Sequence, residues 1–191
     1  ANAALGLMEP TGNGVGGGGK ASGGALWMQG RGEYGGDPVH LDLTKVEFAG
    51  NSAVGGSAGA QGSATLGPNQ GGRVAGGALG VVNWVQVVIN DVTLVKNLGE
   101  GGGVGDNAPG SGSATGTGGV VQGGAAFLDS PASLVATHLT VDRNTARGGK
   151  GADSAAGSGT DAGEGGFAYC GGVLISNSTG GLSEQPATIP L

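Results

Sequence analysis

The chain has 191 residues, of which 48 are glycine and only 7 are proline, and its formal net charge is −6. The glycines keep no period of three, which excludes collagen, and a hydrophobic fraction of 37% with 12% charged residues argues against solvated disorder. Scattered acidic residues attract neither nucleic acid nor an anionic membrane, and no segment approaches the roughly 20 apolar residues that span a bilayer. We therefore expect no nucleic-acid partner and no transmembrane segment.

The first residues, ANAALGLMEP, precede any repeat and begin without methionine, as a mature secreted chain does after signal removal. We therefore predict a secreted protein, located extracellularly or at a cell surface. Residues 1–22 are assigned to an N-terminal arm and glycine-rich lead-in, and residues 23–181 to a single repeat domain. Residues 182–191 are assigned to a C-terminal arm.

Three asparagines, Asn51, Asn97 and Asn144, anchor a repeat with spacings of 46 and 47 residues. Apolar residues precede each asparagine by ten, eight, five and three positions, with few exceptions. A step of two residues is the signature of a strand, and the step of three marks a bend. We predict that these positions form inward-facing core columns: Leu41, Leu43, Val46, Phe48, Val87, Ile89, Val92, Leu94, Leu134, Leu139 and Val141.

Polar pairs occupy the bend in each copy, at positions 44–45, 90–91 and 137–138. Each copy is therefore predicted to be a strand, a corner and a second strand that ends at an asparagine. Asparagine tolerates the left-handed conformation of sharp corners, and its amide can pair with an identical residue stacked above it. A shortened fourth copy, with Leu174 three residues before Asn177, completes the predicted corners: Asn51, Asn97, Asn144 and Asn177.

Glycine pairs recur in register with these strands. They open GGAL at residues 23 and 76 and GGAA at residue 123, and they follow each asparagine by four and five residues. We expect them to supply positive-φ corners and places where one backbone packs closely on another. The glycine-rich inserts, residues 57–75, 103–122 and 150–164, are either extra coils or loops gathered on one side.

Repeats of this kind predict an all-β protein, a right-handed parallel β-helix (β-solenoid) with glycine-rich inserts, in which each coil buries its neighbour. A β-sandwich is the competing all-β fold, but its strands need not repeat one pattern in register.

The paired motifs resemble those of a known family of bacterial surface proteins. The segments GGAL, GGAA and FAGN, with the variants LVKN, VDRN and LISN, resemble the GGA[ILV] and FxxN repeats of polymorphic outer-membrane proteins across about residues 23–181. That resemblance implies a β-helical passenger domain of an autotransporter-type adhesin. Only one copy has the aromatic residue of FxxN, and the chain contains no membrane-barrel translocator.

Two features of the sequence bear on metal and thiol chemistry. GGKGAD, residues 148–153, matches the start of a calcium-binding nonapeptide, with Asp153 as its first candidate ligand. The motif occurs once, and Ala155 stands where a large apolar residue belongs. We therefore predict no metal and no cofactor, and we expect the single cysteine, Cys170, to be a small buried side chain.

Catalysis on carbohydrate is the main enzymatic alternative, because β-helices that cleave polysaccharides place carboxylates in a groove along stacked rungs. Asp42, Asp91, Asp129 and Asp142 are the candidates, but the first two do not share a column. Neither His40 nor His138 has a second ligand at metal spacing. The side chains of Trp27, Trp84 and Tyr34 could stack on sugars if they are exposed.

We therefore expect a non-enzymatic structural or adhesive solenoid, with a carbohydrate-binding or polysaccharide-cleaving β-helix as the alternative. The open ends of a β-helix present unpaired strand edges that invite another chain. Apolar arms flank the repeat, so we predict end-to-end self-association into filaments, with possible contacts to a host surface or a polysaccharide. The predicted assembly arms include Leu5, Leu7, Ile189 and Leu191.

Overall fold

The computed structural model describes residues 3–5, 17–30, 37–59, 70–105, 116–153 and 162–176. These residues form sixteen strands and no helix, and all strands pair in parallel. The strands make four separate four-stranded sheets that do not close into a barrel. The predicted all-β class is therefore confirmed.

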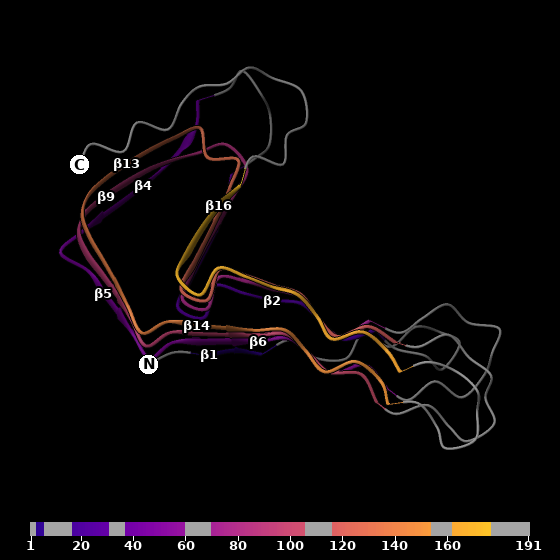
Figure 1. Cartoon of the computed structure of the whole chain (residues 1–191). Coiled ribbons are helices and arrows are strands. Elements are labelled where there is room, and N and C mark those ends of the chain that lie inside the picture. Colours follow the sequence, from indigo (N-terminus) through magenta and orange to yellow (C-terminus); the bar gives the residue numbers. More distant parts are fainter. Residues whose placement is uncertain are drawn as a thin grey trace.

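Two of the sheets enclose the body of the molecule, on the left in Figure 1. The first, called the β9 sheet, is bent and contains β4 (Val39–Thr44), β5 (Glu47–Ala49), β9 (Val85–Val95) and β13 (Ser133–Asp142). The second, called the β16 sheet, contains β3 (Leu26–Gln29), β8 (Leu79–Val82), β12 (Ala126–Asp129) and β16 (Val173–Ser176).

The other two sheets run side by side away from the body (Figure 1). The β2 sheet contains β2 (Ala21–Ser22), β7 (Val74–Ala75), β11 (Val121–Gln122) and β15 (Ala168–Tyr169). The β14 sheet contains β1 (Ala3–Leu5), β6 (Ser52–Val54), β10 (Leu98–Glu100) and β14 (Thr145–Arg147). The chain visits the β2, β16, β9 and β14 sheets in that order and then starts again, and we call each such circuit a pass.

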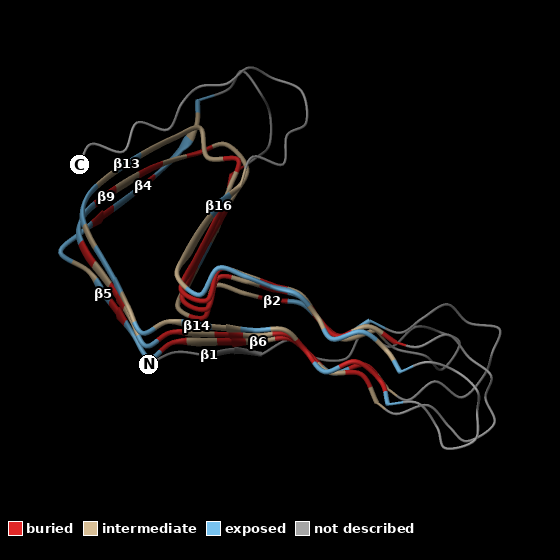
Figure 2. Ribbon diagram, viewed as in Figure 1, coloured by how far each residue is buried: buried red, intermediate tan, exposed pale blue. Residues whose placement is uncertain are grey.

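The predicted core columns are in register. Leu41 pairs with Val87 and Val87 with Leu134. Beyond the bend, Phe48 pairs with Leu94 and Leu94 with Val141. In the middle pass these side chains are fully enclosed, as Figure 2 shows in red for β9. The core therefore forms because the same apolar pattern returns at the same height in each pass.

The first corner lies where the polar pairs predict it. Its second residue has a left-handed backbone in every pass, with φ between 51° and 56°, at Lys45, Asp91 and His138. At the second corner, however, the left-handed residue precedes the asparagine, at Gly50, Lys96 and Arg143. The prediction that asparagine itself is left-handed is wrong. The preceding residue turns the chain, and the asparagine side chain is then free to point inward.

The two glycines of each GG pair have the two expected roles, a positive-φ corner and a close backbone contact. Gly76 and Gly123 open their motifs with φ of 74°, and a Cβ on the following Gly77 would lie 2.0 Å from the carbonyl oxygen of Gly124. In the last pass Cys170 takes the corner position with φ of 58°, and it is exposed. The expectation of a buried cysteine is therefore wrong, because Cys170 lies in the last pass, where the carbonyl of Val173 is the only hydrogen-bond partner of its Sγ among the described residues.

The described parts of the glycine-rich segments continue the β2 and β14 sheets outward, as Figure 1 shows on the right. Small buried side chains, including Ala53, Val74 and Val121, separate the two sheets. Further out, a Cβ on Gly102 would lie 1.9 Å from the carbonyl oxygen of Gly56, so only glycine fits. There the chain leaving the body and the chain returning to it, which we call the two legs, form direct backbone hydrogen bonds with N-to-O distances of 2.8–3.0 Å. These bonds connect Gly19, Gly56, Gly72, Gly102, Gly119, Gly149 and Gly166.

The ends of the stack differ from the expected boundaries. Strands β1 and β2 already pair within the sheets, although both lie before residue 23. Strand β16 lies in register on β12, so Leu174 stacks on Phe127 and Ser176 on Asp129. The last segment therefore repeats the GGAA half of the motif and not the asparagine half. Asn177 and the arm at 182–191 lie outside the described residues.

Candidate functional site

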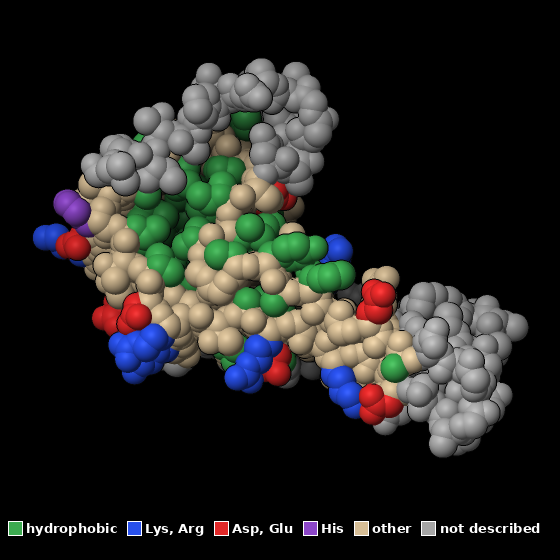
Figure 3. All heavy atoms as spheres, viewed as in Figure 1, with side chains coloured by type: hydrophobic (Ala, Val, Ile, Leu, Met, Phe, Trp, Pro, Cys, Tyr) green, Lys and Arg blue, Asp and Glu red, His purple; other side chains and the backbone are tan. Residues whose placement is uncertain are grey.

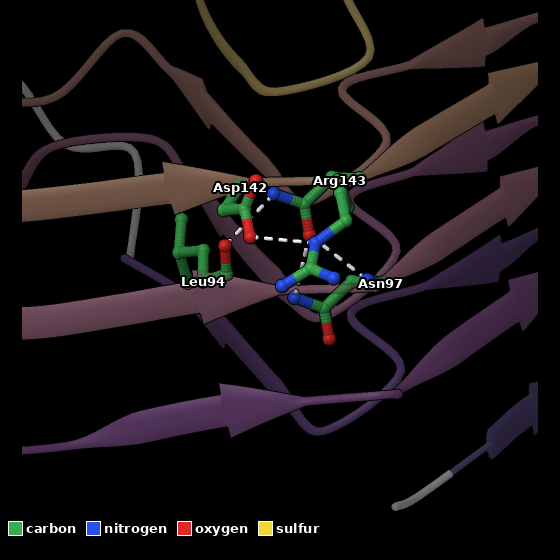
Figure 4. A network of polar contacts seen from close by, with 5 residues as sticks. Leu94, Asn97, Asp142 and Arg143 are labelled. Carbon is green, nitrogen blue, oxygen red and sulfur yellow. Dashed lines mark hydrogen bonds and ion pairs between the residues drawn. The ribbon is translucent and has the colours of Figure 1, made fainter.

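The asparagines form a hydrogen-bonded ladder inside the stack. The side chain of Asn97 is 1% exposed, and its Nδ2 donates to Asn144 Oδ1 at 2.9 Å and to the Phe48 carbonyl at 2.9 Å. Its Oδ1 accepts from the backbone N–H of Asn51 at 2.9 Å and from the Asn51 amide at 3.0 Å. Asn144 repeats the pattern by donating to the carbonyl of Leu94, beside the exposed Asp142–Arg143 ion pair (Figure 4). These amides are structural, as the stacked pairing predicts.

The candidate carboxylates are dispersed over the molecule. Asp42 faces outward beside Val88, and Asp91 lies at the first corner. The carboxylate of Asp142 pairs with Arg143, whereas Asp129 accepts a hydrogen bond of 2.7 Å from the hydroxyl of Ser176 on the outer face of the β16 sheet. The described residues therefore do not assemble these acids into a catalytic pair.

The calcium candidate has a different partner. The carboxylate of Asp153 lies 2.7 Å from Nζ of Lys150, and both side chains are largely exposed. Within the described ranges, no group of three or more His, Cys, Asp or Glu side chains is placed to hold a metal ion. His40 and His138 are both exposed on the β9 sheet.

The two ends of the stack differ in exposed apolar surface. At the first pass Leu41, Leu43 and Phe48 are all buried. In the last pass the corresponding surface is open, and Figure 3 shows hydrophobic side chains between β13 and β16. On that surface Val141 and Ile175 are exposed, whereas Val135, Phe167 and Tyr169 are exposed on the outer faces of the same pass. Val141, predicted as core, is 42% exposed because none of the described strands lies beyond β13.

The predicted assembly arms are only partly visible. Leu5 lies in β1, where its backbone is in register with Val54 of β6. Leu7, Ile189 and Leu191 lie outside the described residues. The N-terminal strand thus adds to a sheet of its own chain.

A hollow between the β16 and β2 sheets was not foreseen from the sequence (Figure 3). Trp27, which is 39% exposed, borders it in the first pass, and Tyr169, which is 50% exposed, borders it in the last. Trp84 is half-buried elsewhere, and Tyr34 lies outside the described residues. Strands of two residues carry no readable alternation, so the sequence held no signal for the face that the β2 sheet presents here.

Comparisons with protein-family models, with curated proteins and with solved structures gave no match. Among the described residues, no helix has the length and apolar character needed to cross a membrane.

Proposed function

We propose that the protein is a right-handed parallel β-helix that serves as an extracellular structural or adhesive solenoid and self-associates through its ends. The handedness follows from the strong preference of parallel crossover connections for the right-handed sense. A non-enzymatic role is consistent with the dispersed carboxylates. The resemblance of the paired GGA and FxxN-like motifs to those of surface adhesins supports the extracellular placement.

The observation that carries this proposal is the open last pass. Strands β13, β14, β15 and β16 are the edge strands of the four sheets at the last pass, and their outer edges have no partner strand within the described part of the chain. Such edges are templates for pairing with another chain. Apolar side chains that would be buried inside a longer stack, such as Val141 and Ile175, lie exposed between them.

Two kinds of contact would pair the strand edges and bury the apolar side chains at such an end. A last pass that meets the first pass of the next copy gives a head-to-tail joint, which repeats into the predicted filament. Two last passes that meet around a two-fold axis give a closed dimer, and this second contact buries apolar surface on both sides. Both are end-to-end assemblies that depend on the same surface.

Substitution of Val141 by lysine tests the end contact. We expect the wild-type chain to sediment as dimers or filaments at tens of micromolar and Val141→Lys to sediment as a monomer, because a charge at the joint must be desolvated. Thr140→Lys is the matched control, since it adds the same charge on the outward-facing neighbour. Analytical ultracentrifugation with negative-stain imaging separates dimers from filaments. A wild-type monomer at high concentration, or equal effects of the two variants, contradicts the proposal.

A further inference from the structure

The hollow between the β16 and β2 sheets is bordered by strands from all four passes. Its wall is the outer face of the β16 sheet, where Trp27, Gly80, Phe127 and Leu174 are in register. A Cβ built on Gly80 would lie 2.3 Å from Cε3 of Trp27 and 3.1 Å from the carbonyl oxygen of Ala75. The indole therefore lies over the neighbouring strand, and the two sheets meet closely at the base of the hollow.

The floor is the face of the β2 sheet that points away from its small core. Ala21, Val74 and Val121 point into that core, so the residues on either side of them face the hollow. One floor column contains Ser22, Ala75, Gln122 and Tyr169. Backbone hydrogen bonds place Arg73 next to Val120 and Val120 next to Phe167 in the other column.

Two cations are concentrated on this floor. Lys20 and Arg73 are consecutive in one column, because Ala21 pairs with Val74, and both are exposed. Neighbouring parallel strands lie about 4.8 Å apart, so the two charges are close enough for one ligand to contact both. Neither forms an ion pair with any residue that the structure describes. The wall also carries the carboxylate of Asp129, which accepts a hydrogen bond from the hydroxyl of Ser176, so the positive charge belongs to the floor.

Aromatic side chains lie in the first and last passes that border the hollow. Trp27 lies in the first pass, and Phe167 and Tyr169 lie in the last, with their ring centroids 6.2 Å apart. The first and last strands of a four-stranded sheet are about 14 Å apart. A ligand that reaches both aromatic positions and the cations must therefore be elongated and lie along the stack.

We propose that this hollow binds a linear acidic glycan, a polymer of sugar rings that carry carboxylates. The flat aromatic faces take the apolar faces of the rings. Arg73 and Lys20 take a carboxylate, for which a guanidinium offers paired donors. The amide of Gln122 and the hydroxyl of Ser22 supply further polar groups on the floor. The inference names a ligand class for the adhesive part of the proposed function and rests on it, but not on the end contact.

Oligogalacturonate is the probe, and isothermal titration calorimetry at low salt is the measurement. The double variant Lys20→Gln/Arg73→Gln is expected to bind at least about tenfold more weakly than the wild type, and Tyr169→Ala about threefold more weakly. The control Lys45→Gln/Lys96→Gln removes the same charge from exposed corners of the β9 sheet and should bind as the wild type does.

The outcomes separate the possibilities. The proposal is overturned if oligogalacturonate does not bind. It is also overturned if the double variant in the hollow and the double variant at the corners weaken binding equally. If polyglutamate binds as tightly as oligogalacturonate, the site accepts any polyanion. If a neutral β-glucan binds as tightly, the cations have no role. Either result overturns the proposal that the ligand is an acidic glycan. Sedimentation of the same samples reports the end contact separately, so that failure of glycan binding and failure of self-association remain distinguishable.

Discussion

Gly102→Ala is expected to lower the free energy of unfolding by about 3 kcal/mol or more, because the added methyl group has no space. Its Cβ would lie 1.9 Å from the carbonyl oxygen of Gly56 and 2.8 Å from the backbone nitrogen of Gly72. Both atoms belong to backbone, which cannot rotate away as a side chain does. The two legs must separate, and the hydrogen bonds from Gly102 to Gly72 and from Gly119 to Gly102 are then lost.

Gly103→Ala is the matched control one residue further on. Its Cβ would lie 3.7 Å from the carbonyl oxygen of Lys150, an ordinary contact. Alanine also reduces the conformational freedom of the unfolded chain, so we expect no loss and a gain of up to about 1 kcal/mol. Urea unfolding gives the global effect, and amide hydrogen exchange at Gly119 and Gly149 detects opening confined to this region. Equal tolerance of both substitutions contradicts direct backbone packing of the legs.

Asn97→Ala is expected to destabilise the protein by a similar amount, about 3 kcal/mol or more. The substitution removes an amide that is 1% exposed. The backbone N–H of Asn51 and the carbonyl of Phe48 are then left in the interior without this partner. Each buried polar group left unsatisfied costs about 1–3 kcal/mol, and a cavity adds to the loss.

Lys96→Ala, at the adjacent left-handed position, is the control for the ladder. Lys96 is exposed, and alanine has a comparable difficulty with positive φ, so we expect a change within about 0.5 kcal/mol. Thermal unfolding of the two variants in parallel is sufficient. A loss for Asn97→Ala no greater than that for Lys96→Ala means that the ladder does not stabilise the stack.

The long strands were predictable because their apolar positions recur at fixed distances from an asparagine. Leu41, Val87 and Leu134 share one column in the sequence and in the structure. The bend at Asp91 was equally visible, since an extra residue interrupts a period of two. Such signals depend only on local alternation and on a repeat length near 47 residues.

The glycine-rich segments were not predictable in the same way. A glycine that is needed because another backbone approaches within hydrogen-bonding distance looks, in one sequence, like a glycine in a flexible linker. Gly102 and Gly103 are indistinguishable by type, yet only Gly102 faces a backbone that excludes a Cβ. The alignment of Asn177 with the other asparagines was wrong for a related reason. Its segment contains GGVL, which corresponds to GGAL, and this motif forms a strand of the β16 sheet and not a strand that ends in asparagine.

The candidate site was least accessible to sequence reasoning. Arg73 and Tyr169 are 96 positions apart in the chain and share no motif. They lie on one floor only because two-residue strands of successive passes stack in register. The four carboxylates that the sequence singled out remain apart for the same reason, since stacking places each in a different column.

The in-register parallel stack is the central claim, and disulfide cross-linking tests it most directly. In a Cys170→Ser background, Thr44→Cys and Asn90→Cys lie opposite one another on adjacent strands, about 4.8 Å apart and within the Cα separation that a disulfide spans. His40 pairs with Gln86, so a cysteine at position 40 is displaced by about 13 Å along the strand from one at position 90. We predict that mild oxidation cross-links 44 with 90, detected by peptide mass spectrometry, and leaves 40 and 90 unlinked. Efficient linkage of 40 with 90, or none between 44 and 90, contradicts the stack.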